Sequence, residues 1–251
     1  MTRAEFKALC ARKMVVLDGA TGTELVKQGM PPGVCPEAWI LDHPEALTAV
    51  QGAYAAAGSD IVYVPSFGGN AVKLGEFGLA DKTFDINRRL AELSRRAAGP
   101  GTLIFGDLAP TGNFVVPIGE WPFEEAVRIY AEQVRALLAG GVDGFVIETM
   151  MDLQEARAAL LAVRENGGSD LPVMVTMTFE SGGRTLTGGL PEAALAALQA
   201  LGADAFGCNC STGPGDMAAI IARIKPYAKI PLIAKPNAGL PLLRDGKTVF
   251  T

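Results

Sequence analysis

Short runs of apolar and β-branched residues alternate with longer stretches of helical spacing along the whole sequence. The short runs end in Gly, Pro, Asp or Asn, and the longer stretches are rich in Ala, Leu, Glu and Arg. A strand followed by a helix is the repeating unit of a parallel sheet covered by helices. Seven strands are expected, at residues 14–18, 60–66, 102–107, 143–148, 172–179, 204–210 and 231–237.

Long helices are expected between these strands. Asp152 can cap one of them, and Pro191 stands where a first-turn proline is tolerated. Seven units favour a (β/α)8 TIM-type barrel of the α/β class over an open doubly wound sheet. The segment 18–24, DGATGTE, also matches neither phosphate-binding glycine loop of open sheets. The expected helices are 44–58, 84–99, 122–140, 152–166, 191–202 and 213–227.

The predicted barrel lacks its eighth strand–helix unit. The last strands begin about 30 residues apart, so an eighth would begin beyond Thr251, where the sequence ends. A barrel without that unit would leave two strand edges unpaired and its core open. We therefore expect residues 1–251 to form one domain that is truncated at its C-terminus or completed by a partner segment.

Composition excludes several classes of protein. The formal net charge of −5 gives no support for nucleic-acid binding. No apolar run is long enough to span a membrane, and the N-terminus lacks the apolar core of a signal peptide. A single histidine excludes a multi-histidine metal site, and four cysteines in 251 residues do not make a disulfide framework. We expect a cytoplasmic protein with reduced thiols.

Chemistry is expected at the C-terminal ends of the strands, where barrel enzymes carry their active sites. Alternate residues of a strand share a face, so Cys208 and Cys210 are expected to point the same way, as are Lys235 and Asn237. Carboxylates, thiols and an amide are therefore expected to converge at the mouth of the barrel, which the C-terminal ends of the strands form. The strand-end residues are Asp18, Gly19, Ser66, Phe67, Gly68, Asp107, Glu148, Thr149, Thr178, Asn209, Cys210, Lys235, Pro236 and Asn237.

The residues alone leave several roles open. Cys210 could be a metal ligand, a nucleophile or a buried filler. The nearby thiol of Cys208 favours the metal-ligand role, although a zinc ion needs three or four ligands. Asp18 and Glu148 could be an acid–base pair, could bind a substrate ammonium group, or could cap turns. Lys235 could form a Schiff base, as in a barrel lyase or aldolase, or be ion-paired with a carboxylate.

Seven stretches, most of them at strand ends, form a recognisable series: LDGATGTEL (17–25), SFGGNAVKLGEFGL (66–79), FGDLAPTG (105–112), ETMMDLQEARAAL (148–160), MTFESGGRTLTG (177–188), GCNCSTGP (207–214) and KPNAGLP (235–241). Taken in order, they resemble the homocysteine S-methyltransferases. The MTF and PNAGLP segments look most like the homocysteine-binding module of cobalamin-dependent methionine synthases.

The resemblance implies a (β/α)8 barrel and a zinc ion held by three cysteines. One of these falls on the Asn209–Cys210 pair. The other two belong to a Gly-Gly-Cys-Cys-Gly stretch on the eighth strand, which this sequence does not contain. Cys208 is an additional thiol that the family does not require. The zinc site is therefore incomplete as written.

The resemblance also assigns substrate contacts. Asp18 and Glu148 match positions that hold the homocysteine amino group, and Gly19 follows Asp18 at the same strand end. Asn237 matches an asparagine beside the zinc. Ser66 and Phe67 match a turn that lines the pocket, although the family often has Asn-Thr-Phe where this chain has Pro-Ser-Phe.

The implied reaction is methylation of the homocysteine thiol to give methionine. Coordination to Zn²⁺ would turn the thiol into the nucleophilic thiolate. The implied methyl donor is methylcobalamin, held on another corrinoid-carrying domain or protein. Two rivals remain: the Schiff-base enzyme that uses Lys235, and a non-catalytic remnant that has lost its zinc motif.

Overall fold

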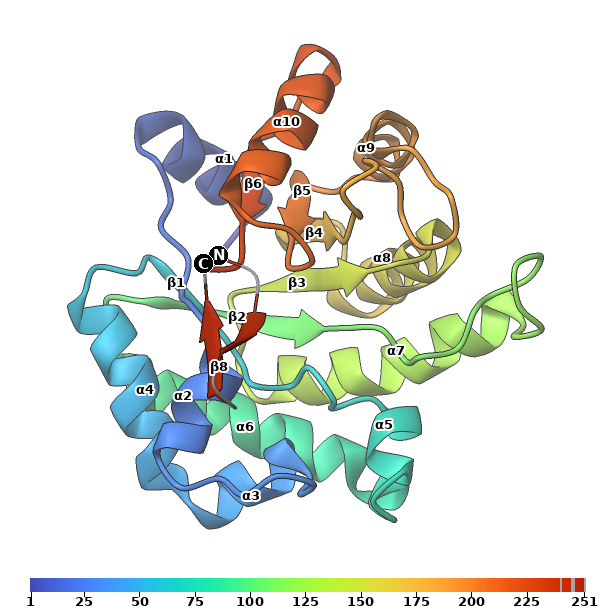
Figure 1. Ribbon diagram of the computed structural model, residues 1–251. Coiled ribbons are helices and arrows are strands. Elements are labelled where there is room, and N and C mark those ends of the chain that lie inside the picture. The colour runs from blue at the N-terminus through green and yellow to red at the C-terminus, as the bar shows by residue number, and fades with distance from the viewer. Residues whose placement is uncertain (240, 245–246, 251) are drawn as a thin grey trace.

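A six-stranded parallel sheet forms the centre of the computed structural model, which describes residues 1–239, 241–244 and 247–250 and the side chains of residues 1–239. The strands follow one another in chain order and curl into an open arc, with helices around the outside (Figure 1). The strands are β1 (Ile61–Tyr63), β2 (Leu103–Leu108), β3 (Gly144–Met150), β4 (Val173–Met177), β5 (Ala205–Asn209) and β6 (Leu232–Lys235).

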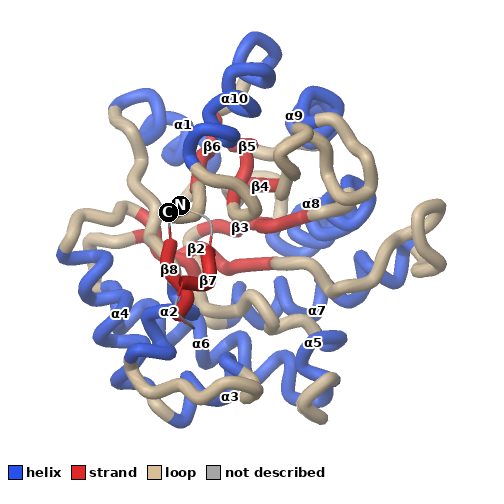
Figure 2. The backbone as a smooth tube through the Cα atoms, viewed as in Figure 1, coloured by secondary structure: helices blue, strands red, loops and turns tan. Residues whose placement is uncertain are grey.

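Helices cover the outer side of this sheet, as the backbone view also shows (Figure 2). Each of the six predicted helices is found within three residues of its expected ends. The short helices α2, α3 and α5 were not predicted. The helices are α1 (Arg3–Arg12), α2 (Thr21–Lys27), α3 (Pro36–Asp42), α4 (Pro44–Ala56), α5 (Ala71–Gly75), η1 (Ala80–Lys82), α6 (Thr83–Ala98), α7 (Phe123–Ala139), α8 (Leu153–Gly167), α9 (Pro191–Ala200), α10 (Pro214–Ile224) and η2 (Lys225–Tyr227).

The first predicted strand, 14–18, is reduced to a single parallel bridge between Leu17 and Ile61. The backbone N–H of Asp18 donates to the Ile61 carbonyl at 3.0 Å, so the segment still runs beside β1. At the other end of the chain, β7 (Pro241–Arg244) and β8 (Lys247–Phe250) form a separate antiparallel hairpin. Leu240, in the PNAGLP stretch, lies outside the described residues.

The inner face of the arc carries one apolar layer. Along each strand, side chains alternate between the helices and the interior. The layer is a buried cluster separate from the larger one between sheet and helices. Its strand residues are Ile61, Tyr63, Phe105, Val146, Met174, Ala205 and Ile233.

Helix α1 packs against this layer. Phe6, only 2% exposed, belongs to the same cluster, and its ring centroid lies 6.0 Å from that of Phe105. A capping box between Thr2 and Glu5 begins the helix. Among the described residues, none of the helices combines the length and apolar character that a membrane crossing requires.

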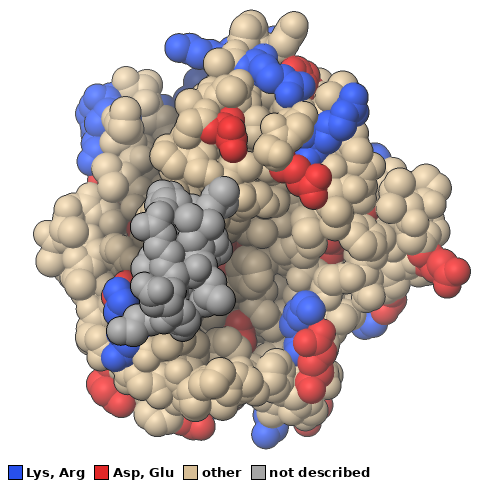
Figure 3. Space-filling model, in the orientation of Figure 1, with Lys and Arg blue, Asp and Glu red and all other residues tan. Residues whose placement is uncertain are grey.

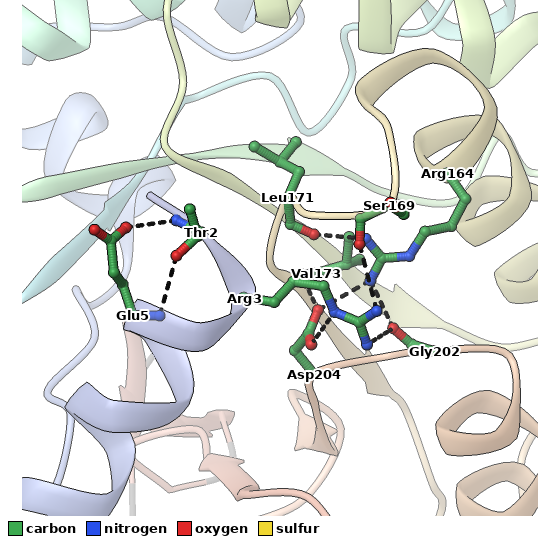
Figure 4. A network of polar contacts seen from close by, with 9 residues as sticks. All are labelled: Thr2, Arg3, Glu5, Arg164, Ser169, Leu171, Val173, Gly202 and Asp204. Atoms are coloured by element: carbon green, nitrogen blue, oxygen red, sulfur yellow. Dashed lines mark hydrogen bonds and ion pairs between the residues drawn. The ribbon is translucent and has the colours of Figure 1, made fainter.

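A charged network holds α1 in this place (Figure 4). Asp204, just before β5, accepts from Arg3 Nε at 2.6 Å, from an Arg164 guanidinium nitrogen at 2.9 Å and from the Val173 N–H at 2.9 Å. The Asp204 side chain is 11% exposed, so these bonds are largely shielded from water. One carboxylate therefore joins α1, α8 and the starts of β4 and β5.

We predict that Asp204→Ala lowers the free energy of unfolding by about 2–3 kcal/mol, because it removes the one carboxylate that two guanidinium groups and the Val173 N–H share. Urea denaturation measures the loss. Asp85→Ala is the control, since Asp85 is 56% exposed and its ion pairs within residues 1–239 are with arginines on its own helix. It should cost less than about 1 kcal/mol. Equal losses in the two variants would contradict the role of the network.

Candidate functional site

A polar ring follows the apolar layer at the C-terminal ends of the strands. Two residues beyond each interior apolar residue, the same face presents a polar side chain, because the side-chain period of a strand is two. On β5 the polar residue comes four positions beyond Ala205, after Gly207. The ring residues, from β2 to β6, are Asp107, Glu148, Thr176, Asn209 and Lys235.

Asp18 joins this ring through an ion pair with Lys235. Its Oδ1 lies 3.0 Å from Lys235 Nζ, and its Oδ2 accepts from the Tyr63 N–H at 2.8 Å. Burial raises the pKa of Asp18, and both contacts oppose that rise. Burial lowers the pKa of Lys235, but Asp18 and Glu148 outweigh it, so this pKa lies above its ordinary value. Lys235 is therefore a protonated, paired lysine.

Glu148 and Asp107 form a carboxyl pair on neighbouring strands. Burial raises the pKa of Glu148, although Lys235 opposes the rise. Burial, and next the charge of Glu148, hold the pKa of Asp107 well above its usual range. Asp107 Oδ1 is buried and has no hydrogen-bond partner among the described side chains. Desolvation and the repulsion between two buried carboxylates favour the protonated form, most strongly at Asp107.

The Cys210 thiol lies at the same mouth. Asn209 Nδ2 is 3.3 Å from Cys210 Sγ and 3.4 Å from Glu148 Oε2, so the amide bridges the thiol and the carboxylate. The Thr149 hydroxyl approaches Sγ at 3.9 Å and accepts from Asn209 Nδ2 at 2.7 Å. Burial, and next the charge of Glu148, raise the pKa of the Cys210 thiol. Without a bound cation the sulfur is therefore a neutral thiol.

Backbone strain is concentrated here. Among the described residues, three that are not glycine have positive φ: Thr149 (59°), Cys210 (57°) and Ser211 (59°). Side chains disfavour this conformation, most of all β-branched ones such as threonine. The Thr149 N–H donates to Asn209 Oδ1 at 2.9 Å, which holds the strained turn against the end of β5. Such strain is common at functional sites.

The expectation that Cys208 shares a face with Cys210 is wrong. Cys208 is buried among the apolar side chains between sheet and helices, and burial raises its pKa to about 12. The alternation ends because β5 stops at Asn209 and Cys210 takes the left-handed conformation. The structure therefore contradicts Cys208 as a metal ligand beside Cys210.

The turn after β1 packs against the backbone of the polar ring. Ser66 is fully buried, and its hydroxyl donates to the Asp107 carbonyl at 2.9 Å, so it positions Asp107 and does not line a pocket. Phe67 is 46% exposed. Gly19 gives room to Tyr54, whose hydroxyl oxygen would lie 2.6 Å from an added Cβ. That hydroxyl donates to the Ala20 carbonyl at 3.0 Å.

Asn237 lies beside the Cys210 loop. Its N–H donates to the Thr212 carbonyl at 3.3 Å, and the Cys210 N–H donates to the Lys235 carbonyl at 3.2 Å. The structure therefore brings Asp18, Glu148, Cys210 and the Asn237 backbone to one mouth. The space-filling view shows a hollow on this side of the molecule, with charged side chains mainly around its rim (Figure 3).

The sequence analysis placed Asp107 and Thr149 at strand ends but assigned neither of them a specific role. The inward direction of the Asp107 side chain could have been predicted, because Asp107 lies two residues after Phe105 on the same face of its strand. For Thr149 no such prediction was possible, since its importance comes from a backbone conformation. Within residues 1–239, no three His, Cys, Asp or Glu side chains lie close enough together to hold a metal ion.

We predict that Asp107→Asn stabilises the protein, and more so as the pH rises from about 4 to about 8. A carboxyl whose pKa is raised in the folded state loses stability over that rise, while the neutral amide does not. Thermal melting across this range measures the difference. Asp85→Asn is the control, since Arg88 lowers the pKa of Asp85 and the small change should have the opposite sign. A gain that shrinks with rising pH would contradict the buried carboxyl pair.

Comparison with known proteins identifies the family of this chain. Residues 15–250 match the family model of homocysteine S-methyltransferases. Methionine synthase of Mycobacterium leprae is 34% identical over 93% of this chain and 20% of its own length, and that of Mycobacterium tuberculosis is 32% identical over 93% and 21%. The chain thus spans about a fifth of these relatives. The metallated homocysteine methyltransferase MmuM of Escherichia coli has the same fold, with a TM-score of 0.82 at 22% identity over 93% of this chain and 87% of its own. The chain belongs to the homocysteine S-methyltransferase family.

Proposed function

We propose that this chain binds homocysteine at the polar ring and presents its thiol for methylation, giving methionine. The observation that carries the proposal is the Asn209 bridge between Glu148 and Cys210. It places a carboxylate that suits an ammonium group beside a sulfur ligand. Homocysteine carries its amino group and its thiol three carbons apart, so one molecule can address both.

Glu148 is the carboxylate best placed for the amino group. Asp18 and Asp107 are buried, whereas Glu148 is partly exposed. Within residues 1–239, no lysine or arginine nitrogen makes a salt bridge with Glu148. A substrate ammonium group there would make charge-assisted hydrogen bonds in a site of low dielectric. Asn237 and Phe67 are proposed as further residues that line the pocket.

Zinc enters the proposal through the family resemblance. When bound, the metal would hold the substrate sulfur as a thiolate, with Cys210 as one ligand. One thiol at this mouth does not fit a complete zinc site, which needs three or four ligands. The two further thiolates are expected from a Gly-Gly-Cys-Cys-Gly stretch outside this sequence.

Methylcobalamin on another domain or protein is the proposed methyl donor. The support is indirect: the curated relatives are methionine synthases of which this chain spans about a fifth. A corrinoid-carrying partner, a cytoplasmic setting and a barrel completed by an eighth unit belong to the same proposal. The chain's own residues orient the acceptor, and effective orientation alone can account for a large part of a rate enhancement.

The Schiff-base alternative has no support in the geometry. A nucleophilic lysine needs a lowered pKa and a free nitrogen. Lys235 has a raised pKa, and its nitrogen is paired with Asp18. Zinc and homocysteine binding can be measured on the protein produced with any residues that follow Thr251 in its coding sequence. If that protein binds neither, it is a non-catalytic remnant of the family.

We predict that Glu148→Gln weakens homocysteine binding about tenfold or more, because it removes a charge-assisted contact with the amino group. It should leave the affinity for 4-sulfanylbutanoate, which lacks that group, nearly unchanged. Isothermal titration calorimetry measures both ligands.

Glu165→Gln is the matched control, since Glu165 is exposed on α8, away from the ring. It should bind both ligands as the wild type does. Equal weakening of both ligands by Glu148→Gln would show that Glu148 supports the fold of the pocket and does not recognise the amino group.

A further inference from the structure

We propose that Glu37, on α3, is a positioning residue: its buried carboxylate holds the turn after β1 and so fixes Phe67 at the mouth. This inference rests on the proposed function, in which Phe67 lines the pocket, and deepens it. Glu37 precedes Gly68 of that turn by 31 residues and lies outside the seven stretches that carry the family resemblance.

The Glu37 carboxylate lies in the protein interior, where the residue is only 4% exposed. Its Oε1 accepts from the Gly68 N–H at 2.7 Å, and its Oε2 accepts from the Cys35 thiol at 3.5 Å. Burial raises the pKa of Glu37, and these two donors, together with the N–H of Glu37 itself, oppose that rise. A buried carboxylate is costly unless it is hydrogen-bonded, so the side chain and the turn hold each other in place.

Helix α3 gives this carboxylate a fixed base. Cys35 directly precedes the helix and Ile40 lies within it, and both belong to the main buried cluster between sheet and helices. The glycine at position 68 permits the close approach, because an added Cβ there would lie 2.9 Å from Glu37 Oε1. A side chain at position 68 would therefore displace either the carboxylate or the turn.

A buried amide holds the same turn from another helix. Gln133, on α7, is fully buried, and its Nε2 donates to the Ser66 carbonyl at 2.8 Å. Phe67 lies between this held carbonyl and the Gly68 N–H that Glu37 accepts. Its backbone is thus fixed on both sides, while its side chain remains 46% exposed.

Removal of the carboxylate would release one of these two sides. The partly buried Gly68 N–H would lose its acceptor, and the turn can regain a partner only by moving toward water. Phe67 would move with the turn. The proposed pocket would then lose part of its wall, although Glu37 itself does not contact the substrate.

Hydrogen exchange and ligand binding together test the inference, on the protein produced with any residues that follow Thr251 in its coding sequence. Glu37→Leu should speed exchange of the Gly68 amide and weaken homocysteine binding, each about tenfold. Glu37→Gln should leave both within about twofold of the wild type, because its amide oxygen still accepts from Gly68 and its amino group can donate to the Cys35 sulfur. Nuclear magnetic resonance measures the exchange, and isothermal titration calorimetry measures the affinity.

Asp204→Ala is the matched control, because it should lose stability at the opposite ends of the strands. It should bind homocysteine within about twofold of the wild type. In a double-mutant cycle, Glu37→Leu should add less than about twofold to the weakening caused by Phe67→Ala, since it acts through that side chain. Thermal melting establishes that each variant is folded.

A Gly68 amide as protected in Glu37→Leu as in the wild type would overturn the inference. So would additive losses from Glu37→Leu and Phe67→Ala, or a Phe67→Ala variant that binds homocysteine as tightly as the wild type. A wild type that does not bind homocysteine would instead overturn the proposed function, whatever the exchange at Gly68.

Discussion

The ion pair between Asp18 and Lys235 joins the two edges of the curled sheet. Asp18 follows the segment that runs beside β1, and Lys235 ends β6, so their contact at 3.0 Å spans the open side of the arc. Buried ion pairs seldom add much stability, since desolvation offsets most of their attraction. In this ring the pair neutralises Asp18, whereas Glu148 makes no salt bridge with a lysine or arginine of residues 1–239. The electrostatic character of the mouth follows from that distribution of charge.

The same ring shows how a fold that is apolar inside can carry polar chemistry. One layer of interior side chains is apolar, and the next, two residues further along the strands, is polar. Of the strained residues, Cys210 comes directly after β5, and Thr149 lies near the end of β3, where the pairing of β3 with β4 shifts its register. Their left-handed backbone turns the Cys210 thiol toward Asn209, while Cys208 stays among the outer apolar side chains. Geometry that a regular strand cannot supply is therefore obtained at two residues with left-handed backbone.

Much of the architecture could be predicted from the sequence, because it depends on periodicity. The alternation of strand and helix patterns gave the parallel sheet, and six helices were found within three residues of their predicted ends. The strand-end argument also gathered Asp18, Glu148 and Cys210 correctly at one mouth. The failures occurred where alternation does not apply. Cys208 was expected beside Cys210, and Ser66 was expected in the pocket although its hydroxyl is bonded to the backbone of β2.

The pairing of charges was harder to foresee. Ion pairing was one of two readings of Lys235, but no sequence rule says that its partner is Asp18, more than two hundred residues away. A crystal structure of the protein with homocysteine bound tests the account most directly. We expect the amino nitrogen within hydrogen-bond distance of Glu148 and the sulfur toward Cys210. An amino nitrogen that makes no contact with Glu148, or a sulfur directed away from Cys210, would contradict it.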